Sequence, residues 1–575
     1  MPRTFWENDE LLFASAVRQF DPWAWHPHPP GYPLYIGIGK FVDFFVGDPF
    51  RSLVSISIVA CVVGYVFLAR TFRRYFDDDP LLAAAGALTF YFSAAAMIHL
   101  TLPLSDSLAL MFVAIALFAA SFFPNEANER LAVALGLTVS AAIGVRPQLL
   151  VPLLPVFFMA LLWTRKPRLI VIALVAFTIL SLCWFLPLMD AAGGFEKLVK
   201  WETLQARYVA THDATVSRGG AAMRSLVAWF VIHPFGAKWL AVPLLLLTGL
   251  GGFLMVRRWR AIYVAPVVFG AIHVAFALTV MDPADSARYS LPHVMIFCMF
   301  IAAAFAATRD ALRMPAVPII AAVLFALMSW MFVSPLIRVR TRTQSPPFAA
   351  AEYAIRHYPP NTIIAYDPSL RPHAEYLLTR FRIMGVDQAL DQFSENGSVP
   401  VVLYVNGGSR AEDDPDTHEF TWPPSEAYRI LTRDVYQKVT LDPVVPGERY
   451  RPMKGVYALE RTTKGEQWRW LQGEATIALP RVRGDSLHVA FTLPPNAPWT
   501  HNTVHLLING TQVATTDVLK GGRAGMRVPL PPTGDVAVTI RSDRTYRPAE
   551  ALGNGDTRDV AVQLVSLDTL PRGAR

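Results

Sequence analysis

The stretch of sequence that decides the fold spans residues 168–189 and reads RLIVIALVAFTILSLCWFLPLM. It carries a single charge, at its first residue, and as a helix it is long enough to cross the roughly 30 Å hydrocarbon layer of a bilayer. Similar runs fill residues 53–335, whereas residues 338–575 have the composition of an ordinary polar protein. The sequence therefore predicts a membrane half followed by a soluble half.

The composition of the whole chain supports this division. Of its 575 residues, 53% are hydrophobic and 17% are charged, and the mean hydropathy is +0.34. Soluble domains carry about 25% charged residues, so a wholly soluble enzyme is excluded. The net charge of +7 does not indicate a nucleic-acid partner, because the Lys and Arg residues occur in short loops between apolar runs.

The cysteines and the first residues narrow the class of protein further. Cys61, Cys183 and Cys298 each lie in an apolar run, so we expect no disulfide framework and interpret each as a small packed side chain. Residues 1–33 contain one short apolar stretch, residues 11–17, which is too short for a signal peptide.

Ten apolar stretches predict a polytopic α-helical membrane domain over residues 1–340, because each approaches the length of a membrane-spanning helix. The predicted spans are residues 53–70, 80–99, 105–123, 130–145, 148–163, 168–189, 235–256, 261–280, 289–308 and 315–336. The pair that meets at Arg146 and Pro147 is interpreted as a broken or re-entrant element buried in protein.

Charge sorting predicts the orientation of these spans. If the ten spans alternate, the basic loops at residues 70–74, 164–168, 257–260 and 309–313 share one face. The positive-inside rule makes that face cytoplasmic, and the N-terminus and everything after Ser334 are then extracytoplasmic. No helix precedes the external N-terminus, so we expect an upstream helix to be missing from this start site. The alternative is that a short N-terminus translocates unaided.

The soluble half divides into two predicted modules. Residues 341–464 mix a helix-like stretch with β-rich runs, which predicts a small α/β module. Residues 465–575 alternate apolar and polar positions and contain an Asn509-Gly510 turn signal, which predicts a β-sandwich of about 100 residues. Trp468, Trp470, Trp499 and Tyr546 offer stacking faces for a sugar, but core or packing residues are the favoured interpretation.

Three polar clusters on the predicted external face are candidates for chemistry. The first is the stretch ENDE at residues 7–10, followed by HPHPPGYPLY at residues 26–35. The second is the Ser-Asp pair at residues 105–106, at the outer end of an apolar helix. The third is DPADSARY at residues 282–289.

Each cluster also has a simpler interpretation. The first is also typical of a solvated loop, and the proline between His26 and His28 argues against convergent metal ligands. Asp106 is either a helix N-cap or a carboxylate facing a cavity. Arg288 is either an anchor for lipid headgroups or a phosphate ligand.

In this order and on one face, the clusters resemble the polyprenyl-phosphate-sugar-dependent glycosyltransferases of the GT-C superfamily. The chain is similar to the bacterial branch of protein O-mannosyltransferases and lipid A aminoarabinose transferases. The resemblance rests on the acidic pair, the HPPGYPLY re-entry, the Ser-Asp helix start, the ARYSLP turn and a C-terminal exported domain. It covers about residues 1–340, although the helix that precedes the acidic loop in that family has no counterpart here.

The resemblance implies a hexosyl- or pentosyltransferase of the cytoplasmic membrane. It would move a sugar from a polyprenyl-phosphate donor to a glycan, lipid or protein acceptor on the outer face. Such a reaction needs a base on the acceptor hydroxyl and positive charge opposite the departing phosphate. The resemblance implies Asp9 or Glu10 as the base, with Asp9 preferred, and Arg288 as the phosphate ligand. The other expected cavity residues are His28, Tyr35, Asp106 and Tyr289. No cofactor is implied, and a divalent metal is left open.

Two other functions are compatible with a membrane half and a soluble half. A non-catalytic membrane anchor that displays a glycan-binding sandwich would need none of the acidic residues for its role. A secondary transporter would need polar midplane residues in two repeated halves. The apolar runs contain few ionisable residues, and His273 is interpreted as a packing residue.

Overall fold

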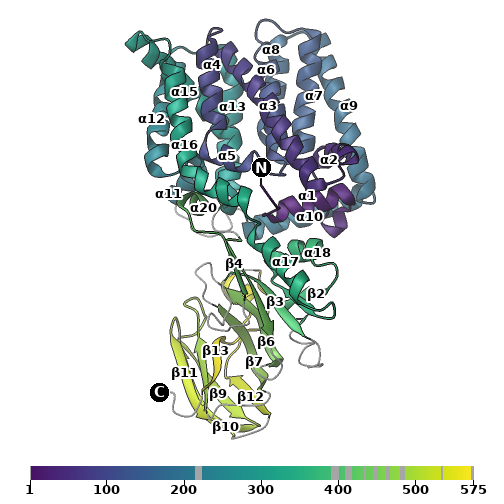
Figure 1. The fold of residues 1–575 in the computed structure, drawn as a ribbon, viewed down its shortest axis with the longest axis vertical. Coiled ribbons are helices and arrows are strands. Elements are labelled where there is room, and N and C mark those ends of the chain that lie inside the picture. Colours follow the sequence, from purple (N-terminus) through teal and green to yellow (C-terminus); the bar gives the residue numbers. More distant parts are fainter. Residues whose placement is uncertain are drawn as a thin grey trace. The chain divides into compact units, whose positions relative to one another are not determined.

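The computed structural model describes residues 2–213, 223–386, 388–389, 400–407, 418–432, 436–444, 451–461, 467–479, 486–531, 535–553 and 555–570. The chain divides into two compact units (Figure 1). The first comprises Met1–Ser345 and Trp422–Gln437, and the second comprises Pro346–Thr421 and Lys438–Arg575.

The first unit is helical, and nine of the ten predicted spans each fall mainly on one helix, whereas the predicted span 80–99 divides between α4 and α5 (Ala94–His99). The helices are α3 (Pro49–Tyr75), α4 (Pro80–Tyr91), α6 (Asp106–Ala120), α7 (Glu129–Val145), α8 (Leu150–Thr164), α9 (Pro167–Ala191), α12 (Lys238–Arg257), α13 (Val264–Thr279), α15 (Leu291–Leu312) and α16 (Val317–Arg342). Among the described residues, seven helices are long and apolar enough to cross a membrane, whereas α4 and α6 are apolar but shorter, so the predicted number of ten spans is not confirmed. The prediction of a multi-pass helical membrane domain is confirmed.

Ion pairs join the basic loops to acidic residues of neighbouring loops. The pairs are Arg74–Glu126 (3.2 Å), Arg168–Glu129 (2.7 Å), Arg260–Asp77 (2.6 Å) and Arg309–Asp79. All of these residues lie at helix ends that strict alternation assigns to one face. The common face of the basic loops is therefore a property of the fold, whereas its cytoplasmic location stays a prediction.

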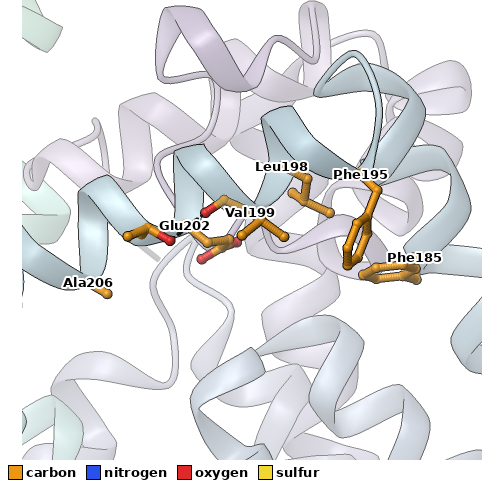
Figure 2. Close-up of a pocket in the computed structure, with 7 residues that line it drawn as sticks. Phe185, Phe195, Leu198, Val199, Glu202 and Ala206 are labelled. Atoms are coloured by element: carbon orange, nitrogen blue, oxygen red, sulfur yellow. Dashed lines mark hydrogen bonds between the residues drawn. The ribbon is translucent and has the colours of Figure 1, made fainter.

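Short helices gather at the other ends of these helices. They are α1 (Asn8–Arg18), α2 (Pro33–Val46), α5 (Ala94–His99), α10 (Phe195–Tyr208), α14 (Ser286–Tyr289) and α20 (Glu426–Leu431). Helix α10 is amphipathic and buries Leu198 and Trp201 against Leu188 of α9. An open apolar groove of about 380 Å³ lies beside α10. Figure 2 shows side chains that line it, among them Phe185, Phe195 and Glu202. Burial raises the pKa of Glu202 to about 7.

The second unit begins with the predicted α/β module. Its five-stranded sheet has the order β2-β1-β3-β5-β4. The strands are β1 (Ile363–Tyr366), β2 (Arg382–Gly385), β3 (Val401–Asn406), β4 (His418–Thr421) and β5 (Lys438–Val444), and the helices are α17 (Pro346–His357) and α18 (Arg371–Leu377). Strand β1 is parallel to β2 and β3, whereas β5 is antiparallel to β3 and β4.

The remaining strands form an antiparallel β-sandwich with the order β10-β9-β12-β7-β13-β8-β11, and β6 pairs with β7. They are β6 (Arg451–Arg461), β7 (Gln467–Leu479), β8 (Ser486–Thr492), β9 (His501–Ile508), β10 (Thr511–Leu519), β11 (Arg523–Pro529), β12 (Val536–Ser542) and β13 (Gln563–Leu570). The alternating Leu487, Val489 and Phe491 are fully buried in one core. Asn509 and Gly510 both have positive φ, as a tight β9–β10 hairpin requires.

Two details of the sandwich refine the sequence-based picture. Strand β6 lies before the predicted boundary at residue 464, yet it pairs with β7 beyond that boundary. Trp470 and Tyr546 are buried and pack edge to face, and Trp499 packs on Tyr546 in the same way. For these aromatic residues, the structure favours the packing interpretation over a sugar-stacking role.

Candidate functional site

Arg288 is the centre of a buried cluster of charges in the first unit. Its side chain is 4% exposed. The guanidinium Nη2 donates to Oδ2 of Asp9 at 2.7 Å, and Nη1 donates to Oε2 of Glu7 at 3.1 Å. Carboxylate oxygens of Asp285 and Asp106 lie 3.7 Å and 3.8 Å from Arg288 nitrogens. The structure thus brings together Asp9, Arg288 and Asp106, which the sequence places almost 300 residues apart at the extremes.

Local sequence explains how the two main partners are presented. Asp9 lies in the first turn of α1, where a carboxylate is favourable to the helix dipole. Arg288 lies in the single turn α14, immediately before α15. Ser290 anchors this turn, because its hydroxyl donates to the carbonyl oxygen of Phe230 at 2.8 Å and to that of Ser286 at 2.5 Å.

A second arginine pairs with the carboxylate at the start of α6. Nη1 of Arg146 donates to Oδ1 of Asp106, and both side chains are buried. The guanidinium of Arg146 also lies 5.4 Å from the ring centroid of Tyr289. Helix α7 ends at Val145 and Pro147 starts a 3-10 turn, so the predicted break in the helix is confirmed.

The loop at residues 26–32 adds a histidine and a tyrosine. Nδ1 of His28 lies 3.9 Å from Oδ1 of Asp9, and Nε2 is hydrogen-bonded to the Tyr32 hydroxyl at 3.2 Å. Gln148 donates to the same hydroxyl at 3.2 Å. Gly31 has φ +86°, and a Cβ there would approach Leu188 to 2.7 Å, so only glycine fits this turn.

No metal centre was found at this site. Within the described part of the chain, no group of three or more His, Cys, Asp or Glu side chains is arranged to hold a metal ion. The two histidines of the loop have different surroundings, since His28 joins the charge cluster whereas His26 pairs through its backbone with Asp21.

Asp9 and Glu10 are adjacent in sequence but have different partners. The Glu10 side chain is 1% exposed, and its Oε2 accepts a hydrogen bond from the backbone N–H of Trp6 at 2.8 Å. Tyr35 is fully buried in α2 and packs edge to face on Phe13. Burial, followed by the charges of Asp106 and Glu10, raises the pKa of Tyr35 well above its ordinary value. Tyr35 therefore lies within electrostatic reach of both carboxylates.

The acidic residues of α1 differ in their protonation. Burial alone would raise the pKa of Asp9, but His28, Arg288 and Arg146 outweigh it and lower the pKa to about 2. Burial also lowers the pKa of His28, so at neutral pH the arginines are the cations that keep Asp9 ionised. Burial raises the pKa of Glu10 to about 7, against the opposing charge of Arg340.

Glu7 behaves unlike Asp9 although it shares the Arg288 guanidinium. Burial raises the pKa of Glu7 well above its ordinary value, and the attraction of Arg288 does not compensate. Of the two carboxyl groups that contact Arg288, Asp9 is therefore the one whose pKa is lowered.

Several buried polar atoms of this cluster have no hydrogen-bond partner among the described residues. They are Oε1 of Glu10, Nδ1 of His28, the hydroxyl of Tyr35, Oδ2 of Asp106, Oε1 of Gln148 and Nε of Arg288. Buried polar groups in proteins are nearly always hydrogen-bonded, and unsatisfied groups are costly. Six such atoms occur in this one cluster, and their hydrogen-bonding capacity is unused within the described residues.

Some residues of this site were missed by the sequence reasoning. Glu7 and Asp285 belong to the quoted motifs but received no role, and Arg146 was recognised only as a break in the helix. An arginine directly before a proline, at the outer end of an apolar run, was the signal that pointed to a buried charge. Tyr32 and Gln148 gave no comparable signal, because only the folded structure brings them together.

Residues 27–188 match the family model of the dolichyl-phosphate-mannose-protein mannosyltransferases. This match supports membership of the GT-C superfamily, as the sequence motifs predicted. No curated protein sequence matches the chain.

Solved structures give weaker similarities. ArnT from Cupriavidus metallidurans, bound to undecaprenyl phosphate, is 12% identical with a TM-score of 0.45, over 76% of this chain and 94% of ArnT. EmbB from Mycobacterium smegmatis is 11% identical with a TM-score of 0.33, over 98% of this chain and 62% of EmbB. The arabinofuranosyltransferase AftD from Mycobacteria is 10% identical with a TM-score of 0.35, over 96% of this chain and 54% of AftD. With TM-scores below 0.5, these likenesses add nothing to the assignment.

Proposed function

We propose that this protein is an integral-membrane glycosyltransferase. It moves a sugar from a polyprenyl-phosphate donor to an envelope acceptor on the outer face of the cytoplasmic membrane. The observation that carries the proposal is the direct pairing of Asp9 with Arg288, 2.7 Å apart, in a cluster that contains unsatisfied buried polar atoms. The family match over residues 27–188 supports the same class of reaction.

In the proposed reaction, Asp9 is the general base. Its carboxylate accepts the proton of the acceptor hydroxyl while the acceptor oxygen attacks the anomeric carbon of the donor sugar. A bond forms between that oxygen and the anomeric carbon, and the bond from the anomeric carbon to the phosphate oxygen breaks. Asp9 suits this role better than Glu10, because the Asp9 side chain is 24% exposed. Glu10 is buried, and its carboxyl group accepts a hydrogen bond from the backbone N–H of Trp6.

Arg288 is the proposed ligand of the donor phosphate. The broken bond leaves its electron pair on the phosphate, and a guanidinium stabilises that charge through two parallel N–H donors. Glu7 and Asp9 accept hydrogen bonds from these donors. The phosphate therefore competes with the carboxylates, and its arrival releases Asp9 from the cation that keeps its pKa low. On this account, donor binding makes Asp9 a stronger base.

The remaining predicted residues are assigned supporting roles. His28 and Tyr289 line the same cluster, since His28 faces Asp9 and the Tyr289 hydroxyl lies 3.5 Å from Nη2 of Arg288. Asp106, which is held by Arg146, orients the acceptor or the base. Tyr35 presents an unsatisfied hydroxyl that can contact the sugar.

Genetic complementation tests the function. Deletion of the gene should remove one lipid-linked or envelope glycan, and the intact chain should restore it. A chain carrying both Asp9→Asn and Glu10→Gln should reach the membrane in normal amounts but fail to restore the glycan. Full restoration by this variant would favour a non-catalytic glycan-binding protein instead.

A further inference from the structure

A segment from the second half of the sequence packs inside the helical unit. Residues Trp422–Gln437 belong to the first unit, although the strands before and after them, β4 and β5, pair with each other in the second unit. Helix α20 within this segment packs against α5, α14 and α16. Nε2 of His99 in α5 is hydrogen-bonded to the carbonyl oxygen of Leu431 at 3.2 Å. We call Trp422–Gln437 the insertion segment.

The insertion segment covers the residue that leads into α1. Trp422 is 5% exposed and stacks on Trp6, with ring centroids 5.9 Å apart and an interplanar angle of 25°. Tyr428 is fully buried and packs edge to face on both indole rings, at 5.7 Å and 6.3 Å. Trp422 is itself fixed, because its Nε1 donates to the carbonyl oxygen of Gln344 at 2.8 Å.

Trp6 in turn fixes the first turn of α1. Its backbone N–H donates to Glu10, and the guanidinium of Arg340 lies 4.9 Å from the centroid of its ring. The next residue, Glu7, contacts Arg288, and so does Asp9 two residues further on. A displacement of Trp6 would therefore shift both carboxylates relative to the guanidinium.

The insertion segment also contacts the helical turn that carries Arg288, the partner of Asp9. Helix α20 packs against α14, the single turn that carries Arg288. One segment thus touches the lead-in to α1 on one side of the Asp9–Arg288 pair and the support of Arg288 on the other. Buried aromatic residues hold geometry well, because they have few rotatable bonds and a large contact area.

We propose that Trp422 is a positioning residue for glycosyl transfer, which through Trp6 holds Asp9 in register with Arg288. The proposal rests on the proposed function for its catalytic consequence, but the positioning itself is independent of it. Misplacement of a catalytic group by about 1 Å can cost roughly 100-fold in rate. Trp422→Ala should therefore lower the rate of glycan formation roughly 100-fold, so that complementation is strongly impaired, while the protein remains folded in the membrane.

A double-mutant cycle based on thermal stability tests the positioning, so that no measurement of enzyme activity is needed. The melting temperature of the purified full-length chain is measured for Asp9→Asn, for Trp422→Ala and for the double variant. Asp9→Asn should lower Tm in the wild-type background and lower it less than half as much in the Trp422→Ala background. A matched control is Trp470→Ala, which also removes a buried indole, 7% exposed, but from the sandwich. Its Tm loss should add to that of Asp9→Asn.

Rescue by a conservative variant separates positioning from general stability. Trp422→Phe keeps an aromatic ring against Trp6 but loses the hydrogen bond to Gln344, and it should restore the glycan where Trp422→Ala does not. Additive Tm losses, an unchanged Tm in Asp9→Asn, or full complementation by Trp422→Ala would each overturn the proposal. If Asp9→Asn complements fully while the cycle is non-additive, the proposed function fails and the positioning by Trp422 stands.

Discussion

Replacing Asp9 by asparagine should change turnover and phosphate affinity in opposite directions. The carboxylate is the proposed base, and loss of a general base costs about 10² to 10⁴ in rate. It is also a competitor for Arg288, so its loss leaves the guanidinium freer to bind the donor phosphate. We expect Asp9→Asn to lower turnover at least a hundredfold and to tighten the binding of polyprenyl phosphate.

The size of the gain in phosphate affinity can be estimated from the pKa of Asp9. The surroundings of Asp9 lower its pKa from an ordinary value of 3.8 to about 2, despite burial. That difference corresponds to about 2 kcal/mol in favour of the carboxylate, to which the 2.7 Å contact with Arg288 contributes. A gain equal to this net shift would raise affinity roughly 30- to 60-fold, although burial hides part of the attraction of the cations for the carboxylate.

The assay compares binding and turnover in the same preparation. Polyprenyl phosphate, the product common to all such donors, is titrated into the protein in lipid nanodiscs, and turnover is followed as release of that product. Glu7→Gln is the matched control, because Glu7 contacts the same guanidinium but has a raised pKa, so that both effects should be small. Weaker binding in Asp9→Asn, or turnover within a few-fold of the wild type, would refute this account of Asp9.

The remaining predictions concern stability, orientation and the sandwich. Burial raises the pKa of Glu10 from 4.5 to about 7, so the folded protein keeps a proton that the unfolded chain releases, and stability should fall as pH rises from about 4.5 to 7. Glu10→Gln should remove up to about 3 kcal/mol of this loss, and thermal unfolding at pH 5 and pH 8 would show a narrower gap in Tm than in the wild type. An alkaline phosphatase fused to the C-terminus should be active, because charge sorting places that end outside; an expressed but inactive fusion would reverse the topology. A chain that ends after Val444 lacks the whole sandwich and should still release polyprenyl phosphate from its donor, whereas a folded but inert chain would place part of the catalytic centre in the sandwich.

The features that could be predicted from the sequence are those that depend on a local pattern of residues. Apolar length identified the helices, the Arg146-Pro147 pair identified the broken element, and the Asn509-Gly510 signal identified a hairpin. The candidate site was predicted in part, since Asp9, Asp106 and Arg288 were expected to share a cavity and do lie together.

Contacts that depend on tertiary packing could not be predicted from the sequence. The pairing of Arg146 with Asp106 needs α6 and the break after α7 to be neighbours, which no local pattern specifies. The insertion segment gave no signal either. The sequence places residues 341–464 in one module, yet Trp422 and Tyr428 bury their rings against Trp6 in the helical unit. Apolar residues indicate that a surface is covered, but they do not indicate by what.

The most direct test of the central claim is the affinity of the full-length protein for polyprenyl phosphate in nanodiscs, measured for the wild type and for Arg288→Ala. This ligand is common to every donor of the proposed class, so the identity of the sugar does not matter. Loss of a charge-assisted contact costs about 1.5 to 3 kcal/mol, so Arg288→Ala should weaken binding by roughly 10- to 100-fold, with Arg288→Lys in between. A wild-type protein that does not bind polyprenyl phosphate, or an Arg288→Ala variant that binds it equally well, would contradict the account.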